Sequence, residues 1–281
     1  MNTNYNYLHG SEKALSMDYN IENRPDPDID GCRKLYDDIV RAYFTDGKIQ
    51  SDAVEVSEQQ FKYIKQYSKV SNKKLWQRYF ALNNDNPKEE SAIYKPPFYT
   101  ILYKKYLLTS DYIGPSIYWA IEKGLSSNQI ICILNKSRTI GGHIVWPRGK
   151  GTTINQARSG EKAFYDRIDW TLFLIKQFCD NGFDTQRTYM DCTDKFGGKI
   201  GIHIQVVLKS INTYREWFEE FGDYGVAFMN FCKQFKLELC FVDEKFNINW
   251  LAPPVPLLPD DYEAFALNNI LAIEKRNMLL K

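Results

Sequence analysis

The residues best suited to chemistry lie in one glycine-rich segment, residues 138–170 of the 281-residue chain. Arginine guanidinium groups match phosphate and carboxylate oxygens through paired hydrogen bonds, and glycine lets backbone amides approach a ligand closely. The pattern therefore favours a site for an anion such as a phosphorylated ligand, a nucleotide or RNA. The side chains expected to bind this anion are Arg138, Arg148, Lys150, Asn155, Gln156, Arg158 and Arg167.

A structural role for the same side chains is an equally strong alternative. Polar side chains in a buried loop often brace one another, and Arg167 lies two residues before Asp169, where it can tie the start of a helix to that loop. The segment is not a phosphate-binding P-loop, because the first glycine of GKGTT lies too close to its lysine. Both interpretations stay open at this point.

Catalysis and metal binding have weaker support in the sequence. His143 and Asp166 are the candidates for proton transfer if the chain is an enzyme. Neither His143 nor His203 has a histidine or cysteine at metal-ligand spacing, so we expect no metal site. The cysteines have no C-x-x-C spacing, no serine lies in a nucleophile elbow, and no cofactor is indicated. The balance favours a protein that is not an enzyme.

The composition is that of a globular protein, with 44% hydrophobic and 25% charged residues. A formal net charge of +1 gives no global attraction to nucleic acid or to a membrane, so an electrostatic partner must bind a local patch. The first residues do not resemble a signal peptide, and no apolar run is long enough to span a membrane. We therefore expect a cytoplasmic protein with reduced thiols.

Aromatic residues are unusually frequent, at 15% of the chain. Residues 217–235 carry more aromatic side chains than one buried helix face needs. Burial between subunits would accommodate the surplus, so we expect self-association. The expected interface residues are Trp217, Phe218, Phe221, Tyr224, Phe228 and Phe231.

Apolar periodicity predicts the elements that must position these residues. Helices are expected over residues 35–43, 57–67, 116–124, 163–179, 211–221, 223–236 and 260–279. Strands are expected over residues 53–56, 129–134, 198–208 and 237–242, although a family pattern would also allow a helix at 129–134. Residues 100–108 suit a strand or a buried helix, and residues 138–160 suit loop and strand.

These elements indicate an α+β fold that is mostly helical with a small sheet. Residues 1–31 are polar and turn-rich, and their two prolines exclude a continuous helix. Residues 32–281 are expected to form a single mixed domain, with a surface loop or a minor subdomain boundary at residues 83–97.

Three sequence blocks resemble a bacterial and phage or prophage family of unknown function. They are TIGGHIVWPR (residues 139–148), TINQAR (153–158) and DRIDWTL (166–172). The same family looks similar at RPDPDIDG, at LLTSD (107–111), at the aromatic segment and at Arg276-Asn277. The resemblance covers most of the chain and implies one domain with a shared polar site. It implies no particular reaction.

Two hypotheses about function follow. The first is a non-enzymatic interaction protein, a phage or prophage factor that binds and inhibits a host defence complex and forms a homo-oligomer. The alternative is an enzyme or binding protein for a phosphorylated ligand, nucleotide or RNA, which would use the arginine- and histidine-rich residues 138–167.

Overall fold

The computed structural model describes residues 54–55, 93–94, 101–103, 106–137, 139–148, 152–160, 164, 166–254 and 261–280. The helices expected at 35–43 and 57–67, the segment 1–31 and most of the loop at 83–97 lie outside the described residues.

Helices dominate the described residues, and a small antiparallel sheet accompanies them, so the expected α+β class is confirmed. The longer helices are α6 (Ser127–Ser137), α8 (Ile168–Asp180), α9 (Thr185–Phe196), α10 (Gly201–Thr213) and α13 (Asp261–Leu279). The shorter ones are α5 (Ile117–Glu122), α7 (Ile154–Gly160), α11 (Arg215–Glu219), α12 (Ala227–Gln234) and the 3-10 turns η2 (Ile140–Gly142) and η3 (Gly198–Ile200).

The sheet has the order β3 (Ile101–Tyr103), β4 (Tyr106–Tyr112) and β5 (His143–Arg148), and all its pairs are antiparallel. The described residues within 100–108 therefore lie in strands, one of the two expected possibilities. In the register, Tyr112 at the end of β4 lies opposite His143 at the start of β5. A separate short ladder pairs β1 (Val54–Glu55) with β2 (Ile93–Tyr94).

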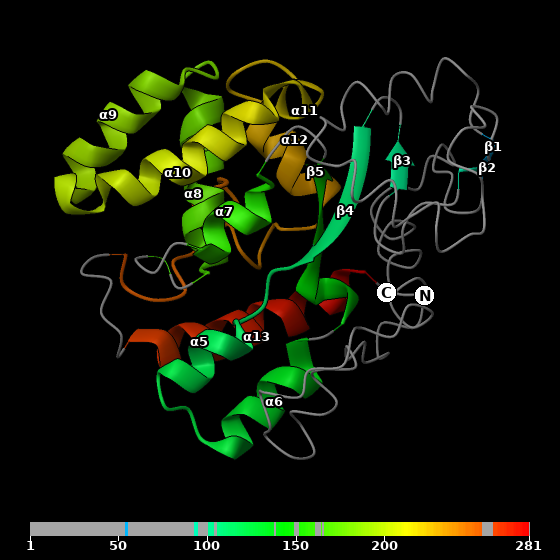
Figure 1. Cartoon of the computed structure of the whole chain (residues 1–281), viewed down its shortest axis with the longest axis vertical. Coiled ribbons are helices and arrows are strands. Elements are labelled where there is room, and N and C mark those ends of the chain that lie inside the picture. The colour runs from blue at the N-terminus through cyan, green and yellow to red at the C-terminus, as the bar shows by residue number, and fades with distance from the viewer. Residues whose placement is uncertain are drawn as a thin grey trace.

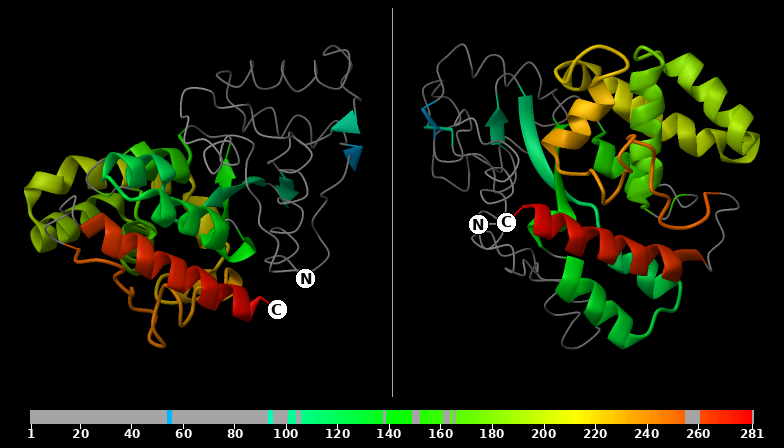
Figure 2. Two further views of the ribbon diagram at one scale, coloured as in Figure 1. Left: turned by 90° about the horizontal axis from the view of Figure 1, so that it is seen from below. Right: turned by 180° about the vertical axis from the view of Figure 1, so that it is seen from behind.

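Two groups of helices lie around the end of the sheet where β4 and β5 meet (Figure 1). Helices α7 to α12 gather on one side, where α10 packs against α7, α8 and α9. Helix α13 runs across the other side and packs against α5, α6 and η2. Figure 2 shows the same division from below and from behind.

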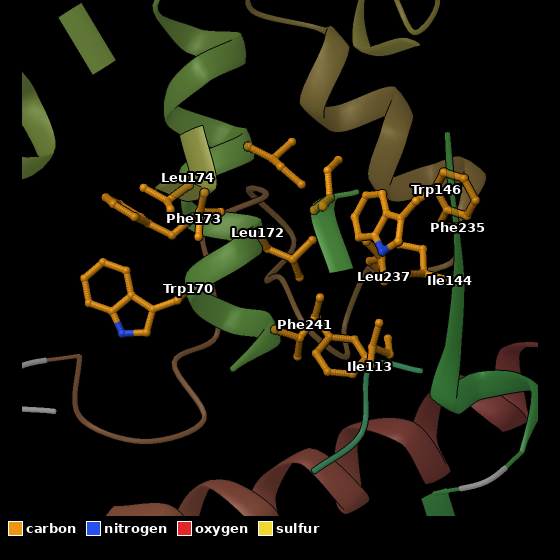
Figure 3. Close-up of a cluster of buried hydrophobic side chains, with 14 of the residues drawn as sticks. Ile113, Ile144, Trp146, Trp170, Leu172, Phe173, Leu174, Phe235, Leu237 and Phe241 are labelled. Carbon is orange, nitrogen blue, oxygen red and sulfur yellow. The ribbon is translucent and has the colours of Figure 1, made fainter. Parts of the chain in front are cut away.

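A single apolar cluster joins the sheet to both groups of helices. Figure 3 shows Ile144 and Trp146 of β5 pointing toward Leu172 of α8. Phe235, at the end of α12, and Phe241, in the turns after that helix, lie close by. Trp146 is fully buried and stacks on Phe231 of α12, with ring centroids 5.8 Å apart. β5 is therefore covered by side chains and lies in the interior of the fold.

The strands expected at residues 129–134 and 198–208 are wrong, because both segments are helical. Residues 198–208 alternate apolar residues, but in α10 the buried face comprises Ile204, Val207, Leu208 and Ile211, which follow helical spacing. Short runs of β-branched residues fit both the helical and the strand spacing of apolar residues, and packing on neighbouring helices decides between the two structures. Residues 129–134 form the middle of α6 for the same reason.

The strand expected at residues 237–242 is also wrong. This segment forms turns with isolated bridges from Val242 to Glu238 and to Ile248. Lys236 and Leu239 adopt left-handed backbone conformations with φ of 51° and 60°, which interrupt an extended chain. The helices expected at 211–221 and 223–236 are present as the shorter α11 and α12.

The helices expected at 116–124, 163–179 and 260–279 are confirmed as α5, α8 and α13. Helix α8 begins five residues later than expected, at Ile168. Asp166 has a left-handed φ of 62°, which a continuing helix does not allow. Asp166 thus belongs to the turn before α8, whereas Asp169 lies in its first turn.

Candidate functional site

Arg158 is the centre of the first of three buried polar clusters built by residues 138–170 and their partners. Its side chain is 1% exposed, and its two terminal nitrogens reach four acceptors. Nη1 donates to the backbone oxygen of Asp166 at 2.8 Å and lies 2.5 Å from its carboxylate Oδ1. Nη2 donates to the backbone oxygen of Tyr112 at 2.5 Å and to Oδ1 of Asn155 at 2.8 Å. Arg158 therefore joins α7 to the end of β4 and to the turn before α8.

The second cluster is formed by Arg167 and Asp169, which are 3% and 0% exposed. Nε and Nη2 of Arg167 contact the two carboxylate oxygens of Asp169 at 3.0 and 2.5 Å, a bidentate ion pair. Arg167 also donates to the backbone oxygens of Ala252 and Pro253, and Asp169 accepts from the amide of Leu251. The pair expected as a brace is present, and the loop that it holds is residues 251–253.

The third cluster depends on Arg276, which sequence reasoning did not single out as a functional residue. Its fully buried guanidinium donates to the backbone oxygens of Phe235, Gly141 and His143 at 2.5–2.9 Å. The neighbouring Asn277 accepts from the amide of Gly141 at 2.8 Å and donates to Oγ1 of Thr139 at 2.7 Å. The end of α13 therefore fixes the 3-10 turn that leads into β5.

The two glycines of that turn are required by close contacts. A Cβ atom on Gly142 would lie 1.8 Å from the backbone oxygen of Ser137, and one on Gly141 would lie 2.6 Å from Oδ1 of Asn277. The sequence TIGGHI is thus explained by the packing of the chain on itself. No ligand is needed to account for it.

His143 is buried between the turn and the sheet, at 2% exposure. Its Nδ1 lies 2.8 Å from the backbone oxygen of Thr139, and its ring lies 5.6 Å from that of Tyr112. The Tyr112 hydroxyl contacts Oγ of Ser137 at 2.5 Å, and burial raises the pKa of Tyr112 well above its usual range. Burial likewise raises the pKa of Tyr262, which donates to the backbone oxygen of Ser116. Both phenols therefore stay protonated at neutral pH.

The predicted anion-binding residues do not all meet. Asn155 and Arg158 touch, but Gln156 caps the start of α7, where its Oε1 accepts from the amide of Thr153. Arg167 belongs to its own cluster with Asp169. The remaining predicted residues, Arg138, Lys150 and the side chain of Arg148, lie outside the described part of the chain.

The aromatic residues predicted for an interface divide between core and surface. Trp217, Phe218, Phe228 and Phe231 are at most 3% exposed and pack within the chain's own core. Phe221 is half-buried against the same cluster, and Tyr224 is 70% exposed. The segment divides into two short helices, α11 and α12, that pack against each other, so aromatic side chains over a wide arc of the sequence pattern are buried in the chain's own core.

Five described cysteines have free thiols, and burial raises the pKa of the most enclosed of them. The pKa of Cys192 rises to about 12. Thiolates are the reactive form. We therefore expect Cys179, Cys192 and Cys232 to resist iodoacetamide at pH 8 in the folded protein and to react fully after unfolding in guanidinium. Peptide mass spectrometry measures this, with the half-buried Cys132 as the internal comparison. Rapid labelling of Cys192 in the folded state would contradict it.

No group of three histidine, cysteine, aspartate or glutamate residues within the described chain is arranged to hold a metal ion. None of the described helices is both long and apolar enough to cross a membrane.

A family model described as "Family of unknown function (DUF6994)" matches residues 37–197, more than half of the chain. The chain belongs to this family. The match includes the three sequence blocks at 139–172 and ends at the close of α9, so the family region contains Arg158, Arg167 and Asp169 but not Arg276. No curated protein and no solved structure matches the chain. The family's description carries no activity, and a function must be argued from the structure itself.

Proposed function

We propose that this member of the family acts by binding another protein, and that residues 138–167 are the scaffold of the fold. The observation that carries the proposal is that Arg158 and Arg167 are buried and already hydrogen-bonded within the chain. The terminal nitrogens of Arg158 and Arg167 already contact oxygens of the chain itself, and both side chains are at least 97% buried. A phosphate would have to displace these contacts and leave Asp166 or Asp169 with a buried, unpaired charge.

The exposed side chains of α9 and α10 suit a protein partner. Met190 of α9 is 55% exposed, and Ile202 and Val206 of α10 are 66% and 39% exposed. Exposed apolar groups of this kind, surrounded by polar residues, are typical of protein interfaces. Helix α9 also carries exposed charges of both signs, including Arg187 and Asp191. Such mixed charge favours a protein surface over a polyanionic nucleic acid.

We further propose that the partner is a host defence complex and that binding inhibits it, as a phage or prophage factor would. This part of the proposal rests on the sequence resemblance to the bacterial and phage or prophage family. The alternative, binding of a phosphorylated ligand, now depends on Arg138, Arg148 and Lys150, because Arg158 and Arg167 are engaged elsewhere.

The proposal is tested by affinity capture from bacterial lysate with the full chain. We expect one stoichiometric protein to be retained by the natural sequence and lost with Ile202→Glu, because the new charge would lie in the apolar contact. Leu239→Glu is the matched control, since it places the same charge at another exposed apolar residue, 45% exposed, in the turns that follow α12.

Two outcomes would count against protein binding through α9 and α10. One is equal recovery of the same protein with Ile202→Glu. The other is an empty capture together with a rise in melting temperature when a nucleotide is added. A ligand at about 100 times its dissociation constant stabilises a protein by about 2.7 kcal/mol, which a thermal scan detects readily.

A further inference from the structure

Helix α13 carries three large apolar side chains on the face opposite to its buried one. Leu267, Leu271 and Met278 are 60%, 54% and 63% exposed. At 3.6 residues per turn these three positions fall within an arc of about 40°. The buried face is formed by Tyr262, Phe265, Ala266, Asn269, Ile270, Ala272, Ile273 and Arg276. The right view of Figure 2 shows α13 lengthwise, with α5 and α6 packed along one side.

The charged residues beside these three apolar side chains differ between the two flanks of the helix. On the flank toward α6, Glu263 accepts from Gln129 at 2.5 Å, and Glu274 forms an ion pair with Lys136 at 3.2 Å. On the opposite flank lie Asp261, at the start of the helix, and Lys275, four turns further on. Within the described chain, neither Asp261 nor Lys275 has an ion-pair partner.

This arrangement is complementary to itself. In two antiparallel helices related by a two-fold axis, the same flanks face each other. With the axis at residue 268, Asp261 of one helix lies at the height of Lys275 of the other, and this pair occurs twice. The same register places Leu267 and Leu271 of the two helices at alternating heights along the seam, so that they can interdigitate.

We propose that α13 pairs with α13 of a second copy of the chain, antiparallel and centred on residue 268. Leu267 and Leu271 of both copies supply the apolar contact, and the two Asp261–Lys275 pairs fix the direction and register of the helices. This interface uses a different surface from the partner site proposed on α9 and α10, so either can fail without the other.

Sedimentation velocity of the full chain over a range of concentrations tests the pairing. We expect a monomer–dimer equilibrium for the natural sequence. Leu267→Glu combined with Leu271→Glu should give monomer at every concentration, since both side chains are more than half exposed and their replacement leaves the core intact. Ile202→Glu, an equally exposed position on α10, should leave the equilibrium unchanged.

A charge exchange separates this register from a general apolar contact. Lys275→Glu and Asp261→Lys should each weaken self-association by about tenfold or more, because like charges then face each other twice in the dimer. An equimolar mixture of the two single variants should form a heterodimer, in which each opposed pair again has opposite charges. A mixture that remains monomeric, or a natural sequence that is monomeric throughout, would overturn the proposal.

Discussion

Replacing Arg158 with alanine is expected to lower the free energy of unfolding by about 3–5 kcal/mol, because Asp166 would keep a buried charge without its partner. Two further acceptors, the backbone oxygen of Tyr112 and Oδ1 of Asn155, would lose their donor. For a chain of this size such a loss lowers the melting temperature by about 10 °C. Urea unfolding followed by circular dichroism measures it.

Arg215→Ala is the control for the Arg158 experiment. Arg215 forms an ion pair with Glu219 at 2.6 Å, but both side chains are well exposed, at 50% and 39%. Solvent screens such a pair, so its loss should change stability by less than about 1 kcal/mol. If Arg158→Ala were as stable as the natural sequence, the scaffold interpretation of residues 138–167 would be wrong, and Arg158 would again be a candidate for ligand binding.

Replacing Gly142 with alanine is expected to destabilise the fold by about 3 kcal/mol or more, the upper range for forcing an extra methyl group into a packed interior. The new Cβ would lie 1.8 Å from the backbone oxygen of the buried Ser137, and a backbone atom at the end of α6 cannot simply turn aside. The turn and the start of β5 would both have to shift. Thermal unfolding of the purified variant measures the effect.

Gly198→Ala is the matched change for Gly142. A Cβ atom at Gly198 would meet no other atom within 4 Å, and its backbone is not left-handed. This variant should therefore unfold at nearly the same temperature as the natural sequence. A Gly142→Ala protein with unchanged stability would show that the turn can adapt, and that the glycines of TIGGHI are retained for another reason.

Apolar periodicity predicts a helix well where the apolar residues that follow helical spacing are the buried ones. In α8, Ile168, Leu172, Ile175 and Cys179 are all buried, and that helix was correctly predicted. In α10, by contrast, Ile202 and Val206 are exposed although they are as apolar as the buried Ile204. An apolar surface residue removes the contrast between faces that distinguishes a helix from a strand. Sequence reasoning failed there for this reason.

Two helix starts are marked in the sequence by capping boxes. Thr153 and Gln156 exchange side-chain and backbone hydrogen bonds at the start of α7, and Ser126 and Gln129 do the same at α6. Both pairs match the pattern of serine or threonine followed three residues later by glutamine. Reading Gln129 as part of a cap would have predicted a helix in place of the strand at 129–134.

The sequence predicted which segment carries the candidate site, but not which residues contact one another there. Local spacing suggested the Arg167–Asp169 pair, because the two residues are neighbours. It could not reveal that Arg276 reaches Gly141 and His143, which lie more than 130 residues earlier in the chain. Whether an arginine binds a ligand or a carbonyl depends on which segments fold next to it, and this is a property of the tertiary structure.

The contacts of Arg276 and Asn277 also impose an order on synthesis. During translation β4, β5 and the turn between α6 and β5 leave the ribosome long before α13, yet the carbonyls of Gly141 and His143 accept hydrogen bonds from Arg276 of that helix. Until residue 277 has emerged, the nascent chain holds these polar groups without their final partners. The fold should therefore close late, and chains shortened within α13 should become substrates for cellular proteases.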